Sequence, residues 1–149
     1  GCISYTQSPV HTVEKYVEMC KELKNMGFDT ICLKDMAGTM SPYEAEHLIK
    51  GIKDAVGDMP LILHTHCTTG MAYMTVTKAI ESGIDVIDCA TSCFSNGTSQ
   101  PATETMFYAL QQYGIQTGLH QSRKLFSQKD SVGGQCNLAD PGNGFQLFY

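Results

Sequence analysis

The sequence lacks the features that mark several large classes of protein. Its 149 residues contain no apolar run near the ~20 residues that a membrane-spanning helix needs, and no signal-peptide pattern, so we expect no integral membrane role. Basic residues are not in excess, since the formal net charge is −5, which argues against nucleic acid as a partner. A GxGxxG motif and a phosphate-binding GxxxxGK motif are both absent, and the first residue is Gly1 rather than methionine.

A paired cysteine framework is absent as well. The number of cysteines is odd, at seven, and several of them lie inside apolar runs, where a free thiol packs as a small hydrophobic group. This pattern favours a reducing compartment, and the cytoplasm is therefore the expected location.

What the sequence does contain is an alternation of short apolar strands and amphipathic helices. Strands are expected over residues 29–34, 61–66 and 84–89, and helices over residues 9–26, 42–56, 70–82 and 101–113. This alternation indicates an α/β fold with a parallel sheet, either an open doubly wound sheet or a (β/α)₈ barrel. Residues 119–149 show no sustained period, which predicts an irregular tail or a segment that is not native to the domain.

Several helix starts can be assigned from capping residues. Ser8 is expected to cap the first helix, because the proline that follows it suits the first helical position. Ser41 and Glu44 form a capping box at the second helix. Thr68 and Thr69 are the expected N-caps of the third helix.

The strongest local signal for chemistry is the pair His64 and His66. Side chains two residues apart on a strand point to the same face, so two imidazoles at the carboxyl end of a parallel strand could bind one metal ion. The alternative is that one histidine is a hydrogen-bonded core residue and the other a surface residue. The preceding strand ends in Lys34 and Asp35, one βα repeat earlier. Because a protonated lysine repels a metal ion, the residue types alone favour Asp35 as the further ligand.

Three ordered segments make the sequence recognisable as similar to a known family. Residues 31–38 (ICLKDMAG), 63–72 (LHTHCTTGMA) and 97–104 (GTSQPATE) resemble the biotin-dependent carboxyltransferases, which include the oxaloacetate decarboxylase α subunit and the carboxyltransferase domain of pyruvate carboxylase. The opening residues 5–12 are more similar to the decarboxylase. Related lyases and synthases also use an HxH strand, but they lack the first and third of these segments.

The resemblance implies a fold, cofactors and site residues. It implies that residues 1–118 are part of a (β/α)₈ TIM barrel, about strands 4 to 7 or 8, with a divalent metal (Zn, Mn or Co) at its mouth. Lys34 would be the catalytic lysine that binds this metal as a carbamate, and His64 and His66 would be the imidazole ligands. Ser99 and Gln100, in the loop at the barrel mouth, are the candidates for contact with substrate. The family's aspartate ligand, and the threonine that exchanges a proton with biotin, have no counterpart in this sequence.

The implied reaction moves the carboxyl group of oxaloacetate to biotin and leaves pyruvate. The expected partners are the small-molecule substrate, a separate biotinyl carrier domain and, for a decarboxylase, its membrane subunits. Two alternatives remain open. The chain could be the corresponding piece of a pyruvate carboxylase, or a truncated, catalytically inactive fragment that serves at most as an interaction module.

Overall fold

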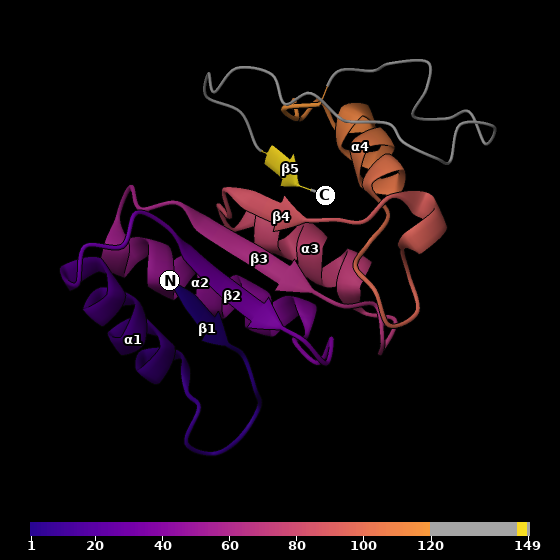
Figure 1. The fold of residues 1–149 in the computed structure, drawn as a ribbon. Coiled ribbons are helices and arrows are strands. Elements are labelled where there is room, and N and C mark those ends of the chain that lie inside the picture. The colour runs from indigo at the N-terminus through magenta and orange to yellow at the C-terminus, as the bar shows by residue number, and fades with distance from the viewer. Residues whose placement is uncertain (120–145, 149) are drawn as a thin grey trace.

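The computed structural model describes residues 1–119 and 146–148 of the chain. Its centre is one sheet in which neighbouring strands run parallel and follow one another in chain order (Figure 1). The strands are β1 (Cys2–Ser4), β2 (Ile31–Asp35), β3 (Leu61–Thr65), β4 (Val86–Asp88) and β5 (Gln146–Phe148).

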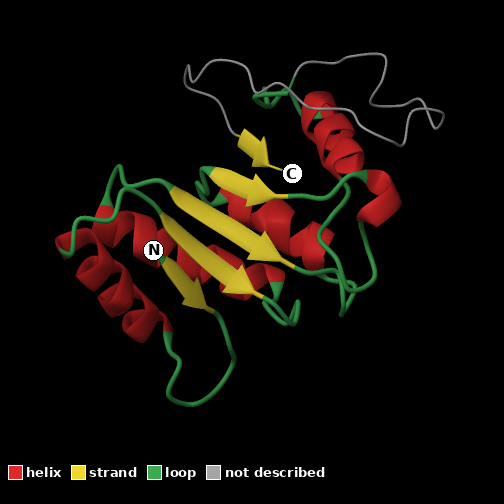
Figure 2. Cartoon of the chain, viewed as in Figure 1, coloured by secondary structure: helices red, strands yellow, loops and turns green. Residues whose placement is uncertain are grey.

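Helices connect the strands and cover one face of the sheet. They are α1 (Val13–Asn25), α2 (Pro42–Val56), α3 (Ala72–Glu81) and α4 (Thr103–Gln112), with the short η1 (Ser92–Phe94) before α4. In Figures 1 and 2, α2 and α3 lie behind the sheet and α1 lies beside its β1 edge, with α1 against α2 and α2 against α3. A doubly wound sheet has helices on both faces and reverses its strand order. The sequential order and one-sided helices therefore decide for the barrel arrangement.

The core lies between this sheet and its helices. Alternate residues of β2 and β3 are fully buried, while those between them are only partly buried, as expected for strands with one covered face. Each large aliphatic side chain buried in this way contributes about 1.5–3 kcal/mol. The buried aliphatic residues of β2, β3 and α2 are Ile31, Leu33, Leu61, Leu63, Leu48, Ile49, Ile52 and Val56.

The predicted start of the second helix is confirmed and that of the first is wrong. Ser41 and Glu44 form both hydrogen bonds of the capping box at α2. The first helix begins at Val13 rather than after Ser8, and Thr12 is its N-cap. The Ser8 hydroxyl instead bonds to His11 Nδ1 at 2.7 Å, within a short turn that ends where Thr12 becomes extended.

The third helix also begins later than expected. Its N-cap is Met71, which makes no side-chain capping bond, so Thr68 and Thr69 are not its caps. The Thr69 hydroxyl donates to the carbonyl oxygen of Gly38, which ties the loop after β3 to the loop after β2. The side chain is thus used for a contact between loops that sequence spacing does not reveal.

Two strands were not expected from the sequence. β1 and β5 have three residues each and lie at the two edges of the described sheet. β5 falls in the stretch expected to be irregular. The rest of that stretch, residues 120–145 and 149, lies outside the described residues, as do the predictions made for it.

Candidate active site

Polar side chains meet at the carboxyl ends of the strands, on the face that α1, α2 and α3 leave uncovered. Ser4, Lys34 and His64 are register partners on β1, β2 and β3, so their side chains lie in one row. Asp88, at the end of β4, continues the row, because its Oδ2 lies 2.8 Å from His64 Nδ1. The carboxyl ends of the strands are where barrel enzymes build their active sites.

The two histidines face one another across this end of the sheet. His64 Nε2 and His66 Nε2 are 3.1 Å apart. Their outer nitrogens have separate partners: His64 Nδ1 faces the Asp88 carboxylate, and His66 Nδ1 lies 2.6 Å from the carbonyl oxygen of Thr98. The structure thus brings the predicted histidine pair together and holds each ring from the outside.

These partners determine which nitrogens carry protons. A carbonyl oxygen can only accept, so Nδ1 of His66 is the donor; the Asp88 carboxylate accepts from Nδ1 of His64 in the same way. In neutral rings both Nε2 atoms then carry lone pairs that converge on one point. Histidine ligands of metal ions have this arrangement, with Nε2 toward the metal and Nδ1–H bound to a carboxylate or a carbonyl oxygen. The donor set therefore fits a divalent ion.

The loop before α4 reaches the same point. Gln100 Nε2 lies 3.3 Å from His64 Nε2 and 3.2 Å from His66 Nε2, where an amide donor meets the two lone pairs. Ser99 Oγ donates to Gln100 Oε1 at 3.0 Å and so fixes the orientation of the amide. Of the two residues expected to contact substrate, Gln100 lies directly beside the histidines and Ser99 acts on Gln100.

Lys34 lies on the adjacent strand, next to His64 in register. It is half-buried, and its backbone carbonyl accepts from the backbone N–H of Tyr5 at 2.8 Å. Within residues 1–119, its ammonium group makes no hydrogen bond or ion pair. Lys34 is therefore the strand neighbour of His64, and no other side chain in residues 1–119 holds its amine.

Asp35 is not part of this cluster, so its nomination as a ligand was wrong. The residue is fully buried and points to the helix-covered side of the sheet. Its carboxylate accepts from the backbone N–H groups of Thr39 and Met40 at 2.9 and 3.0 Å and from the Thr65 hydroxyl at 2.9 Å. The period of two along β2 separates it from Lys34, because successive side chains point to opposite faces. Asp35 fixes the loop after β2.

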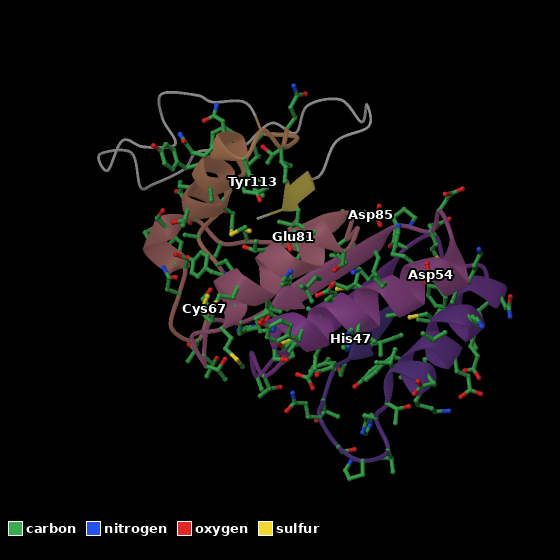
Figure 3. The ribbon with its side chains drawn as sticks, turned by 180° about the vertical axis from the view of Figure 1, so that it is seen from behind. His47, Asp54, Cys67, Glu81, Asp85 and Tyr113 are labelled. Atoms are coloured by element: carbon green, nitrogen blue, oxygen red, sulfur yellow. The ribbon has the colours of Figure 1, made fainter. Side chains whose placement is uncertain are left out.

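Two thiols next to the site have raised pKa values. Burial raises the pKa of Cys67, which directly follows His66 and lies where the chain leaves β3 (Figure 3). Burial, assisted by the negative charge of Asp88, raises the pKa of Cys89 to about 12. Both thiols are therefore harder to deprotonate than an ordinary cysteine.

Sequence reasoning missed two groups that hold the histidines. Asp88 had a usable signal, because it ends the strand that follows the histidine strand and thus reaches the same edge of the sheet. The Thr98 carbonyl had none, since a backbone oxygen is the same at every position. Within residues 1–119 and 146–148, no three His, Cys, Asp or Glu side chains cluster as a metal site would need.

Comparison with known proteins gives the family. The family model described as HMGL-like matches residues 3–132. The chain belongs to the HMGL-like family. Two relatives confirm the predicted resemblance of the chain to the carboxyltransferases. It is 51% identical over 119 residues to a pyruvate carboxylase subunit of Methanocaldococcus jannaschii, and 46% identical over 124 residues to the methylmalonyl-CoA carboxyltransferase 5S subunit of Propionibacterium freudenreichii subsp. shermanii.

The HMGL-like chain is also similar to a solved carboxyltransferase structure. The carboxyl transferase domain from Rhizobium etli pyruvate carboxylase, solved with 3-hydroxypyruvate, matches with a TM-score of 0.71 and 36% identity over 74% of this chain and 19% of that chain. The predicted fold, part of a TIM barrel, is thereby confirmed. The matches cover 80% and 83% of this chain but only 21% and 25% of the two relatives. No helix described in residues 1–119 is long and apolar enough to cross a bilayer.

Proposed function

We propose that this chain supplies one wall of a metal-dependent carboxyltransferase site of the pyruvate carboxylase type. The observation that supports this proposal is the convergence of His64 Nε2 and His66 Nε2, with both Nδ1 atoms bound from outside. These two residues would bind a divalent ion (Zn, Mn or Co). Lys34, as a carbamate, would be the third ligand, since it lies beside His64 and its amine is free of other described partners.

The residues around the pair would each have a defined task. When bound, the ion would supply Lewis-acid stabilisation of the enolate form of pyruvate. Asp88 and the Thr98 carbonyl would keep both rings in the ligating tautomer. Gln100, oriented by Ser99, would donate its amide hydrogens to a substrate oxygen, because the amide already lies within 3.3 Å of the pair.

The proposed reaction exchanges a carboxyl group between a keto acid and biotin. In the decarboxylating direction, the carboxyl carbon of oxaloacetate leaves for a biotin nitrogen, and the resulting enolate takes the proton that this nitrogen loses to give pyruvate. The reverse direction carboxylates pyruvate. The archaeal relative is named as part of a pyruvate carboxylase, which favours this second candidate for the physiological direction.

The partners and location follow from the same proposal. Biotin would arrive on a separate carrier domain, and in a decarboxylase the chain would also assemble with membrane subunits. We keep the cytoplasm as the proposed compartment. Six cysteines in the described part of the chain are free thiols, as a reducing environment favours.

Cobalt binding tests the ligand assignment. The 149-residue chain is titrated with Co²⁺ and its visible d–d absorption is recorded for the wild type and for His64→Ala and His66→Ala. His47→Ala is the matched control, since His47 lies on α2, away from the site (Figure 3). We expect weak binding by the wild type and the control, because the family's aspartate ligand has no counterpart, and roughly tenfold weaker binding by the two site variants.

A second arm tests the carbamate. Bicarbonate supplies the CO₂ that a lysine carbamate requires, so adding it should strengthen Co²⁺ binding by the wild type but not by Lys34→Arg. Absence of Co²⁺ absorption in the wild type at saturating metal, or equal absorption in both histidine variants, would refute the proposal.

Metal binding and turnover, measured together, separate this proposal from the inactive-fragment alternative. The chain spans about a fifth of the archaeal relative, and an isolated piece of that size is expected to bind metal without releasing pyruvate from oxaloacetate. Biotin-dependent pyruvate release by the chain would show that it is an active enzyme by itself. Loss of both metal binding and turnover would leave the inactive fragment as the remaining hypothesis.

A further inference from the structure

The segment that carries Thr98 and Gln100 is an exposed turn with an uncommon backbone. Asn96 and Gly97 have φ values of 66° and 55°, in the left-handed region that favours glycine, and Asn96 has a side chain. The turn is closed by two backbone bonds, Ser99 N–H to Asn96 O at 2.8 Å and Asn96 N–H to Gln100 O at 2.9 Å. From outside the turn, the backbone N–H of Cys67 donates to Ser99 O at 2.7 Å and ties its centre to the loop after β3, so the two ends of the turn are what further contacts must fix.

Tyr73 on α3 provides such contacts at both ends of the turn. Its hydroxyl donates to Asn96 Oδ1 at 2.7 Å and accepts from the backbone N–H of Ala102 at 2.9 Å. Its ring packs against the hydrophobic core, so the hydroxyl is held by a rigid part of the fold. In the described part of the chain, no other side chain from outside residues 96–102 bonds to both ends of this segment.

We propose that Tyr73 is a positioning residue for the histidine pair. By fixing Asn96 and Ala102, its hydroxyl keeps the Thr98 carbonyl 2.6 Å from His66 Nδ1, which holds the proton on Nδ1 and leaves Nε2 as the lone-pair donor. Tyr73 touches neither histidine and acts only through this segment. The consequence for metal binding rests on the proposed function, whereas the effect on the His66 tautomer does not.

The test compares Tyr73→Phe with Tyr43→Phe. Both changes remove one hydroxyl and keep the ring, but Tyr43 is exposed on α2 and its hydroxyl makes no hydrogen bond within residues 1–119. Long-range ¹H–¹⁵N NMR of the metal-free chain reports which nitrogen of His66 carries the proton. We expect the Nδ1–H form in the wild type and in Tyr43→Phe, and a mixture of tautomers in Tyr73→Phe.

Cobalt affinity provides the second readout. The loss of two hydrogen bonds that act indirectly should weaken Co²⁺ binding about three- to tenfold in Tyr73→Phe and leave Tyr43→Phe unchanged. Asn96→Gly, which removes the acceptor and keeps a residue that tolerates the positive φ, should reproduce both effects even if Tyr73→Phe fails to fold.

The outcomes separate this inference from the proposed function. Tyr73→Phe and Asn96→Gly spectra in which His66 keeps the wild-type tautomer would overturn the inference, as would equal changes in Tyr43→Phe. Should the wild type bind no Co²⁺ while Tyr73→Phe shifts the His66 tautomer, the proposed function fails and the positioning role stands.

Discussion

Replacing Asp35 with alanine distinguishes a structural carboxylate from a metal ligand. The side chain is fully buried and accepts hydrogen bonds from two backbone N–H groups, those of Thr39 and Met40, and from the Thr65 hydroxyl. Removing it leaves the two backbone donors without an acceptor in a loop that packs on the core. The Thr65 hydroxyl can rotate toward another acceptor, but a backbone N–H cannot.

The size of the effect follows from the two backbone donors. An unsatisfied buried donor costs about 1–3 kcal/mol, so Asp35→Ala, which leaves two of them, should lower the free energy of unfolding by about 2–6 kcal/mol. This is a large part of the ~5–15 kcal/mol that holds a typical domain together. For a chain of this size it corresponds to a fall in Tm of roughly 4 to 24 °C.

Urea denaturation followed by circular dichroism measures this change. Asp29→Ala is the matched control, because Asp29 is exposed in the loop just before β2 and makes no hydrogen bond within the described residues. We expect the control to unfold within about 0.5 kcal/mol of the wild type. Cobalt binding is measured on the same samples in the cold, at about 10 °C, where stability is near its maximum and Asp35→Ala should still be folded.

Two results would refute this reasoning. A loss of less than about 1 kcal/mol, below the cost of one unsatisfied donor, would show that the loop after β2 does not depend on the Asp35 carboxylate. Alternatively, wild-type stability combined with loss of Co²⁺ binding would mean that Asp35 is a ligand after all, as the residue types alone had suggested.

Two further predictions concern Gly38 and Cys20. Gly38→Ala should lower the free energy of unfolding, measured by urea denaturation, by more than about 2 kcal/mol, because φ is +64° and the added methyl group would meet the His66 carbonyl. Gly27→Ala is the control: its φ is +88° but the space around it is open, so it should cost only the ~1–2 kcal/mol of backbone strain. Equal losses in the two variants would contradict the prediction. Burial raises the pKa of Cys20 from 9.0 to about 11, so its contribution to stability is complete below pH 9 and is lost as the pH rises toward 11. Between pH 9 and 11, the free energy of unfolding should fall with pH more steeply in the wild type than in Cys20→Ala, by up to about 1.4 kcal/mol per pH unit. The control replaces the exposed Cys93 with alanine and should keep the pH dependence of the wild type.

Local patterns were sufficient for most of the secondary structure. The helical period and the capping box predict α2 almost to the residue, because both depend on residues within four positions of one another. The start of α1 was misplaced for a related reason. Ser8 and the proline after it suit a helix start, but a turn competes for the same serine hydroxyl, and sequence spacing does not decide between the two.

The sequence predicted which residues lie in the candidate site but not which hydrogen bonds hold them there. His64 and His66 share a side of the sheet because the strand period is two, and this could be foreseen. The same period of two places Asp35 and Lys34 on opposite faces of the sheet. Asp35 was nonetheless predicted as a ligand, because that prediction considered only the charge of the residue and not the direction of its side chain. Which carboxylate meets His64 could not be read from the period of its own strand, because Asp88 comes from another strand.

The alternation of strands and helices, the parallel sheet and the histidine pair are set by short-range periods, and the sequence is enough to derive them. The tautomers of the two histidines and the bridge from Tyr73 to the Asn96 turn are tertiary properties. The physical reason is distance along the chain. His64 and Asp88 are 24 residues apart and His66 and Thr98 are 32 apart, so the bonds that prepare the site exist only after the strands have paired and the loop has folded over them.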